Sequence, residues 1–274
     1  MKFDEIGYWS EIKLQIIQKY AAAYSKILAA QTRARFHRVY IDAFAGAGVH
    51  VSKKRGTPVP GSPLNALAVE PPFQEYYLID LDSDKADHLR ELVRKLYGER
   101  DDVHIYTGDC NDLLLQEILP RVDYRKYERG LCLLDPYGLQ LDWQVIKAAG
   151  HSQAIDLILN FPVMDMNRNV LWRNPEGVEP ADLARMNAYW GDDSWRRVAY
   201  VPEATLFGVE ERKANNEDIA EGFRARLKSI GGFKYVPEPM PMRNSTGAVV
   251  YYLFFASQVS VAGKIASEIF ASYR

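Results

Sequence analysis

Short apolar runs alternate with amphipathic segments along the first 162 residues. We interpret the runs at 39–41, 76–79, 103–107, 130–134 and 155–159 as strands, and the fourth is continuous in apolar residues, as buried parallel strands are. Apolar residues at three- and four-residue steps predict helices at 9–30, 63–69, 85–97 and 111–119. This alternation predicts an α/β fold built on a mostly parallel sheet.

The rest of the chain departs from that alternation. Residues 163–230 hold Trp172, Trp190 and Trp195 among polar residues in two or three predicted helices, and we expect an inserted helical cap with Arg168 near its start. Residues 233–236 and 248–257 predict an antiparallel pair, and 261–273 a last helix. The expected organisation is one domain from 1–162 and 231–274, interrupted by the cap at 163–230.

Four of the predicted strands end on Asp or Asn, and the third closes on Gly108-Asp109. The four residues are Asp42, Asp80, Asp135 and Asn160. Ligands of doubly wound sheets collect at the carboxyl edge of the strands. Ordinary packing does not explain acids placed repeatedly at that edge, so we interpret them as a site.

The first strand runs into a loop, Asp42-Ala-Phe44-Ala-Gly46-Ala-Gly48. Such a loop offers bare backbone N–H groups to a phosphate or to the carboxylate of S-adenosylmethionine (SAM), whose ammonium Asp42 would face. An ordinary glycine turn is the alternative interpretation.

Two further acids fit an adenosine. Asp80, in preference to Asp82, would accept hydrogen bonds from both ribose hydroxyls. Asp109 would accept from the adenine amino group beside the backbone N–H of Cys110, unless it only caps the following helix. The predicted SAM-binding residues are Asp42, Phe44, Gly46, Gly48, Asp80, Leu81, Asp109 and Cys110.

The fourth strand ends in Asp135-Pro136-Tyr137-Gly138. A carboxylate and a proline carbonyl that grip the hydrogens of an exocyclic base amine would favour the tetrahedral, nucleophilic nitrogen, and Tyr137 could stack on the base. A plain β-turn is the alternative. We therefore predict Asp135, Pro136 and Tyr137 as the catalytic residues. Asn160-Phe161 forms either a second wall of that pocket or an ordinary exit turn.

Contacts to a substrate are predicted for short basic segments. Lys53-Lys54-Arg55, in a polar loop at 49–61, would suit phosphodiester oxygens, although a solvated tip fits equally. A second cluster at 33–38 precedes the first strand, and we place it beside the catalytic edge. The net charge of −2 gives no global basic field, so nucleic-acid binding would need such local patches. Asn160, Phe161 and Arg168 complete the predicted substrate-binding residues.

Composition excludes several other classes. Cys110 and Cys132 lie in apolar segments and indicate reduced thiols, and the five histidines lack the spacing of metal ligands, so we predict no metal site. Gly-x-Ser-x-Gly is absent, and the glycine loop lacks the third glycine of a nicotinamide-binding fingerprint. No apolar stretch reaches about 18 residues, and we expect a cytoplasmic protein with no membrane association.

These motifs together resemble the class I SAM-dependent methyltransferases. The opening helix, Gly61-Ser-Pro63, Leu134-Asp-Pro-Tyr-Gly138 and Asn160-Phe-Pro162 more narrowly resemble the three-Cys-motif partner family. The resemblance implies a Rossmann-like methyltransferase fold with a mostly parallel seven-stranded sheet and an antiparallel C-terminal strand. It also implies SAM as the cofactor and association with a three-cysteine, radical-SAM-like protein.

The tetrapeptide bears on the substrate. Asp-Pro-Tyr-Gly departs from the Asp-Pro-Pro-Tyr of adenine-N6 enzymes and is similar to the Asp-Pro-Phe-Gly of tRNA guanine-N2 methyltransferases. The leading hypothesis is a SAM-dependent N-methyltransferase that acts on an exocyclic base amine of RNA or DNA. The alternatives are a methyltransferase for a small molecule or peptide and a non-catalytic partner that keeps a SAM pocket.

Overall fold

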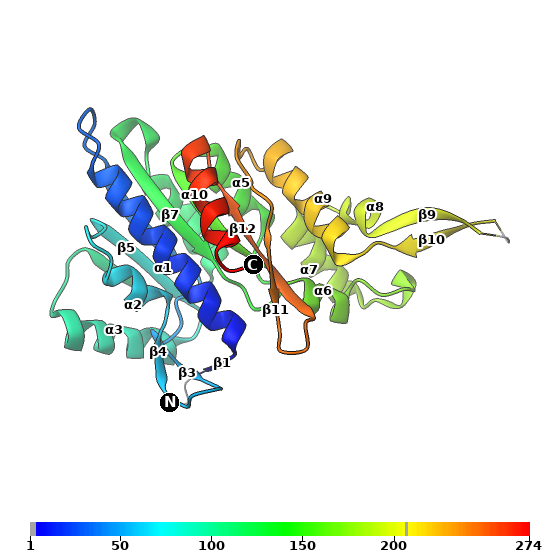
Figure 1. Ribbon diagram of the computed structural model, residues 1–274, viewed down its shortest axis with the longest axis horizontal. Helices are drawn as coiled ribbons and strands as arrows, with labels where there is room; N and C mark the ends of the chain where they lie inside the picture. The colour runs from blue at the N-terminus through cyan, green and yellow to red at the C-terminus, as the bar shows by residue number, and fades with distance from the viewer. Residues whose placement is uncertain (1–3, 206–207) are drawn as a thin grey trace.

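The computed structural model describes residues 4–205 and 208–274, and its centre is one seven-stranded sheet (Figure 1). The strand order is β11-β12-β8-β7-β2-β5-β6. Five strands run parallel, namely β2 (His37–Asp42), β5 (Glu75–Asp80), β6 (Val103–Thr107), β7 (Glu128–Leu134) and β8 (Ile155–Phe161). The fold is thus the predicted Rossmann-like methyltransferase fold, with a mostly parallel sheet and an antiparallel C-terminal hairpin.

That hairpin differs in one strand from the prediction. β12 (Val249–Ala256) lies antiparallel to β8, as expected, but its other neighbour is β11 (Met240–Arg243). The predicted partner at 233–236 makes only one isolated bridge, between Tyr235 and Ser257. The residues between the two predicted strands, 237–247, were expected only to connect them, yet Met240–Arg243 is β11, an edge strand, where the missing N–H of Pro241 is tolerated.

Helices cover both faces of the sheet. One face carries α1 (Tyr8–Ala29), α2 (Ser62–Leu67), α3 (Ser83–Tyr97) and α10 (Ser260–Ala271), and its core includes Tyr20, Leu64, Leu89 and Phe270. The other face carries α4 (Cys110–Leu113), which continues into a π-helical turn at Leu114–Ile118, and α5 (Trp143–His151). Because the helices bury the strands on both sides, the strands are nearly continuous in apolar residues.

The polar segment at 49–61, predicted as a loop, is a β-hairpin. β3 (Val49–Ser52) pairs with β4 (Pro58–Pro60), and the short β1 (Glu5–Ile6) lies parallel to β3 on its other side. Val49, Val51 and Val59 supply an alternation that the flanking Pro and Gly obscured. The hairpin therefore brings the start of the chain to the edge where β2 ends.

The segment 163–230 holds α6 (Val163–Asn169), α7 (Pro180–Trp190), α8 (Trp195–Ala199) and α9 (Asn216–Ser229). It also holds an antiparallel hairpin of β9 (Tyr200–Thr205) and β10 (Gly208–Lys213), which the expectation of a purely helical cap missed and which projects from the body in Figure 1. α9 packs on the sheet, since the ring of its Phe223 lies 5.5 Å from that of Phe254 in β12. Within 4–205 and 208–274, no helix combines the length and hydropathy that a membrane span needs.

Candidate cofactor and catalytic site

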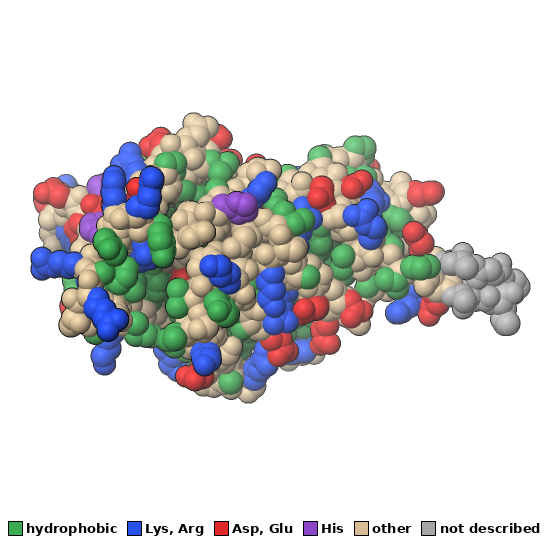
Figure 2. All heavy atoms as spheres, turned by 90° about the horizontal axis from the view of Figure 1, so that it is seen from above, with side chains coloured by type: hydrophobic (Ala, Val, Ile, Leu, Met, Phe, Trp, Pro, Cys, Tyr) green, Lys and Arg blue, Asp and Glu red, His purple; other side chains and the backbone are tan. Residues whose placement is uncertain are grey.

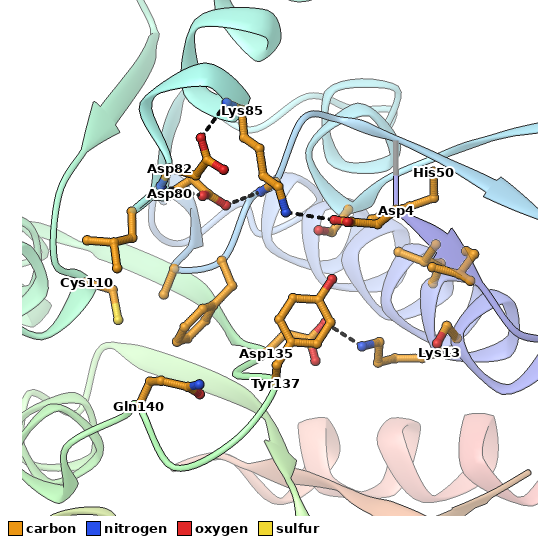
Figure 3. Close-up of a pocket in the computed structure, with 18 of the residues that line it drawn as sticks. Asp4, Lys13, His50, Asp80, Asp82, Lys85, Cys110, Asp135, Tyr137 and Gln140 are labelled. Atoms are coloured by element: carbon orange, nitrogen blue, oxygen red, sulfur yellow. Dashed lines mark hydrogen bonds and ion pairs between the residues drawn. The ribbon is translucent and has the colours of Figure 1, made fainter. Parts of the chain in front are cut away.

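A cavity of about 520 Å³ opens at the carboxyl edge of the sheet (Figure 3). Its walls come from the loop after β2, the ends of β5, β6 and β7, the start of α1 and the segment around β1. Of the residues predicted for the cofactor and the chemistry, those that line it are Phe44, Gly46, Asp80, Leu81, Asp109, Cys110, Asp135 and Tyr137. The acids at the ends of three strands therefore face one hollow of a size that suits a small-molecule ligand.

The glycine loop is held tightly and leaves space above it. Gly46 has φ of 63°, and its N–H donates to Asp80 Oδ2 at 2.7 Å. A Cβ at Gly46 would meet no atom within 4 Å, so the loop faces open cavity there. Gly48, with φ of 80°, lies against Leu89, and its carbonyl accepts from the N–H of Gly61 at 2.7 Å. Both positions need a left-handed backbone, which glycine adopts without strain.

Asp42 lies beneath this loop and does not line the cavity. It is fully buried, and its Oδ1 accepts from the N–H of Phe44 at 3.2 Å, while Tyr40 donates to Oδ2 at 3.4 Å. Burial raises the pKa of Asp42 to about 7, although the Ser62 hydroxyl and the Phe44 N–H oppose the rise. The expectation that Asp42 faces a ligand ammonium is therefore corrected: Asp42 positions the loop from below.

Asp80 joins the loop to the next helix. Besides the Gly46 bond, its Oδ1 accepts from the N–H of Asp82 at 2.9 Å. Asp82 caps α3 by accepting from the N–H groups of Asp84 and Lys85, and Leu81 between the two acids is 74% exposed. A carboxylate oxygen keeps further lone pairs after one bond, so Asp80 can still accept from a ribose.

Asp109 caps a helix, as one of the two interpretations expected, and its position leaves the adenine contact as a prediction. It caps α4 by accepting from the N–H of Asn111 at 2.7 Å, and it also lines the cavity. α4 begins at Cys110, whose N–H is among the first of the helix and has no intrahelical partner. This corner therefore offers an acceptor and a donor side by side.

A buried lysine reaches the tetrapeptide Asp135-Pro-Tyr-Gly138 at the end of β7. Nζ of Lys13, from α1, pairs with Asp135 Oδ2, and the two side chains are only 11% and 22% exposed. The lysine also lies 5.2 Å from the centre of the Tyr251 ring. Burial is the largest single influence on Lys13 and lowers its pKa, but the Asp135 carboxylate, Tyr251 and Tyr137 together raise the lysine pKa above its usual range.

One carboxylate oxygen of Asp135 accepts no hydrogen bond from the described residues. Its Oδ1 is buried and has no hydrogen-bond partner within the described ranges. A buried acceptor without a donor is costly, and such an atom in a cavity wall indicates a place for a ligand donor.

Lys13 itself was not predicted. It interrupts the buried stripe of α1 formed by Leu14, Ile16, Ile17 and Tyr20, and that cation on an apolar face is the signal that could have found it.

The other half of the predicted acceptor pair is already occupied. Pro136 is buried outside the lining, and its carbonyl accepts from Nδ2 of Asn160 at 2.8 Å. Asn160 is buried at the end of β8 and secures the turn instead of forming a pocket wall. Phe161 is fully buried, with its ring 4.7 Å from that of Phe223, so its prediction as a substrate contact is wrong. Tyr137, in contrast, is 75% exposed in the lining.

The predicted basic contacts lie outside the cavity. Lys53 and Lys54 are exposed in the β3–β4 turn, and Arg168 is exposed on α6. Arg55 pairs with the buried Glu11 at 2.8 Å, and Ser52 donates to the same carboxylate at 2.6 Å. Arg55 thus ties its hairpin to α1.

The prediction that the basic cluster at 33–38 lies beside the catalytic edge is wrong. Residues 33–36 precede β2, and His37 and Arg38 are its first two residues. The beginning of a parallel strand lies at the amino edge of the sheet, whereas the cavity is at the carboxyl edge.

Asp4, His50 and Lys85 are ionisable residues of the lining that were not predicted. Asp4 and Lys85 form an ion pair of 2.8 Å, which Figure 3 shows beside Asp80 and Asp82. His50, from β3, has a buried Nδ1 without a partner in the described part of the chain, and burial lowers its pKa.

Cys110 and Cys132 are free thiols, and residues 4–205 and 208–274 hold no group of three His, Cys, Asp or Glu placed for a metal.

Comparison with known proteins gives a likeness in fold. No family model matches the chain, and no curated protein does. Among solved structures, protein LPL1258 from Legionella pneumophila, described as DUF519, is 12% identical with a TM-score of 0.47, covering 95% of this chain and 92% of that one. Trm1 from Pyrococcus horikoshii, solved with S-adenosyl-L-methionine, is 13% identical with a TM-score of 0.48, covering 94% of this chain and 57% of its own.

A third solved structure, an S-adenosylmethionine-dependent methyltransferase from Clostridium acetobutylicum, is 10% identical with a TM-score of 0.42, covering 89% of this chain and 91% of that one. The three identities are too low to transfer a function. Any function assigned to this chain therefore rests on its own residues.

Proposed function

We propose that this chain is a SAM-dependent N-methyltransferase that acts on an exocyclic base amine of RNA or DNA. One observation carries the proposal: the glycine loop, Asp80 and Asp109 share a single cavity with Asp135 and Tyr137. The first three are groups for a nucleoside-bearing cofactor, and the last two are groups for a flat, amine-bearing substrate.

The cofactor half of the cavity fits SAM by its donors and acceptors. The open space over Gly46 suits the amino-acid portion, Asp80 the ribose hydroxyls, and the Asp109–Cys110 corner the edge of an adenine. The exposed Leu81 offers an apolar surface to the adenine face. Bound SAM would supply an electrophilic methyl group.

The catalytic task of the protein's own residues would be to hold the exocyclic amine of the base in position. The unpartnered Oδ1 of Asp135 can accept one amine hydrogen, and the carbonyl of Pro136 keeps a second lone pair beside its bond to Asn160. Lys13 fixes the Asp135 carboxylate from the opposite oxygen, so we assign it as a positioning residue. The exposed ring of Tyr137 is free to stack on the base, a contact worth about 1–3 kcal/mol.

A nucleic-acid substrate is supported by exposed cations in the segments that follow β2 and β8, on the side of the carboxyl edge of the sheet. Lys53 and Lys54 lie in the β3–β4 turn, and Arg168 and Arg173 lie on and just after α6. None of the four makes an ion pair with the described part of the chain, which leaves them available for phosphate oxygens. Figure 1 shows that turn and α6 along the lower side of the molecule.

We further propose, on the tetrapeptide and Asn160-Phe-Pro162, that the chain belongs to the three-Cys-motif partner family and works beside a three-cysteine, radical-SAM-like protein. A small-molecule or peptide substrate is the competing candidate, favoured by the net charge of −2. A partner that keeps the pocket without catalysis is the third. The same assay distinguishes these candidates.

The experiment has two stages. Calorimetric titration with S-adenosylhomocysteine tests the cofactor half, and we expect saturable 1:1 binding that Asp80→Ala weakens at least tenfold. Transfer of a tritiated methyl group from SAM to RNA, DNA and a metabolite extract then tests the substrate, with mass spectrometry of the labelled nucleoside.

Asp135→Asn is expected to lose transfer and keep cofactor binding. Label in the metabolite fraction alone would favour the small-molecule candidate. Tight cofactor binding without transfer to any fraction, with or without a radical-SAM partner, would favour the non-catalytic one. Absence of cofactor binding would overturn the whole proposal.

A further inference from the structure

A second cavity, of about 500 Å³, lies at the amino edge of the sheet, far from the cofactor site along the strands. It is enclosed by α1, α10, the short helical turn Tyr124–Lys126 and the starts of β7 and β8. Its apolar lining includes Tyr20, Tyr24, Phe36, Tyr124, Val261 and Ile265. Figure 2 shows hydrophobic side chains gathered among Lys and Arg over the end of the molecule where α1 ends. The proposed methyltransferase reaction uses none of these residues.

The acid in this cavity is already satisfied. Asp156, at the start of β8, accepts from the Tyr20 hydroxyl at 2.7 Å and from the Ser257 hydroxyl at 2.5 Å. Burial raises its pKa to about 6, with the two hydroxyls and Arg129 opposing the rise. Asp156 therefore has little remaining need for a cationic ligand.

The cation in the wall, Arg129, has no carboxylate at ion-pair distance among the described residues, and Asp156 acts on it only from farther away. The guanidinium of Arg129 lies 3.9 Å from the centre of the Tyr124 ring and 5.0 Å from that of Phe36. Its Nη1 donates to the backbone carbonyls of Tyr124 at 3.0 Å and Glu128 at 2.7 Å. Within the described ranges it forms no ion pair, so two aromatic rings and the backbone hold a half-buried positive charge at the cavity wall.

Further positive charge surrounds the same cavity. Lys234 lines it, and the exposed Arg33 and Arg35 lie three positions and one position before the lining residue Phe36. This is the basic cluster at 33–38 that the sequence singled out and that the cofactor site does not use. The local charge therefore favours an anionic ligand.

We propose that this cavity binds a small carboxylic acid with an apolar, preferably aromatic, body. The carboxylate would pair with Arg129, whose planar guanidinium matches carboxylate geometry. The body would lie against Tyr24, Val261 and Ile265, and the volume is that of a drug-sized ligand pocket. The proposal concerns a different edge of the sheet from the methyltransferase site, so neither depends on the other.

The binding experiment uses three probes in calorimetry: naphthalene-2-acetate, its neutral amide, and acetate. The acid should bind saturably with 1:1 stoichiometry, and the amide at least tenfold more weakly, because it forfeits the charged hydrogen bond to Arg129. Acetate, which lacks the body, should show no saturable binding. The proposal is overturned if the acid does not saturate or if the amide binds as tightly as the acid.

Single substitutions test whether the acid binds in this cavity beside Arg129. Arg129→Gln removes the charge and should weaken the acid at least tenfold, and Ala262→Trp should abolish binding by filling the cavity. Arg125→Gln is the matched control, since Arg125 is a neighbouring arginine that pairs with Asp123 and does not line the cavity. S-adenosylhomocysteine titration and thermal unfolding of each variant report whether it is folded. Unchanged binding in a folded Arg129→Gln would also overturn the proposal.

Discussion

Lys13 and Asp135 are 122 positions apart in the chain and form an ion pair in the wall of the cavity at the carboxyl edge of the sheet. The pair joins the first helix to the end of a central strand. Its free carboxylate oxygen is the buried atom without a donor on which the proposed amine contact rests. Substitutions on either side of the pair should therefore change both the stability of the fold and the chemistry of the site.

Lys13→Met should leave an unpaired carboxylate in the cavity wall. Removing one partner of a buried ion pair costs about 3 kcal/mol of unfolding free energy. Asp135→Asn should show a similar loss, whereas the double variant should lose much less than the sum, which a double-mutant cycle by urea unfolding measures. Additive losses would show that the two side chains do not interact in solution.

The rate of methyl transfer provides a second test of the Lys13–Asp135 pair. In Lys13→Met, transfer should fall by at least tenfold with cofactor binding retained, since Asp135 loses the group that orients it. Lys13→Arg keeps the charge and should recover part of the rate. If transfer in Lys13→Met equals that of the wild type, Lys13 has no positioning role.

Gly46 and Gly56 form a matched pair for testing the loop. Both have a left-handed backbone, with φ of 63° and 65°, and a Cβ at either would meet no atom within 4 Å. Alanine at each should therefore cost a similar strain, about 1 kcal/mol. Only Gly46 lines the cavity, so Gly46→Ala alone should weaken S-adenosylhomocysteine in calorimetry. Equal affinities in the two variants would contradict a cofactor at this loop.

Asp42 should make stability depend on pH. Its pKa in the folded chain is about 7, raised by burial from 3.8, so the folded state binds more protons than the unfolded state between those values. Stability is therefore highest on the acidic side of this window and falls as pH rises toward 7, by on the order of 2 kcal/mol between pH 5 and pH 8.

Asp42→Asn should flatten this decline, measured as urea unfolding free energies at several pH values. The part due to Asp156, whose pKa is raised in the same direction, remains. A decline that is unchanged in Asp42→Asn would show that Asp42 is ionised throughout in the folded protein.

Phosphate binding by the β3–β4 turn can be tested by charge reversal. Lys53→Glu with Lys54→Glu should weaken binding of the RNA or DNA substrate and reduce the slope of log affinity against log salt by about one for each phosphate that is no longer neutralised. Lys95→Glu with Lys228→Glu makes the same change of net charge at exposed positions outside the cavity lining. Equal weakening in both double variants would indicate nonspecific repulsion instead of direct binding by the turn.

Strand direction explains what could be predicted from the sequence. Apolar runs that end on Asp80 and Asp135 place both acids at one edge, because parallel strands share their carboxyl end. The same rule should have placed the cluster at 33–38 at the opposite edge, since those residues precede β2 or begin it. Treating proximity in sequence to the glycine loop as proximity in space caused that error.

Other features depend on contacts that a local pattern does not contain. Nothing near Lys13 in the sequence indicates that its partner is Asp135. Asn160 was expected as either a pocket wall or an exit turn, and its bond to Pro136 decides for the turn only once β7 and β8 are aligned. Phe161 was misassigned for the same reason, because its burial depends on Phe223 from the segment predicted as a cap.

The first helix touches both cavities. Lys13 lies in the wall of the cavity at the carboxyl edge, and Tyr20, Tyr24 and Ile27 lie in the wall of the cavity at the amino edge. The helix that carries them, α1, has 22 residues and is about 33 Å long. A ligand at the amino edge that shifts α1 along its axis must also move the ammonium group of Lys13, which pairs with Asp135. Occupancy of the two ends should then be thermodynamically coupled, and by the same factor in each direction. Calorimetric titration of S-adenosylhomocysteine with and without saturating naphthalene-2-acetate measures that factor.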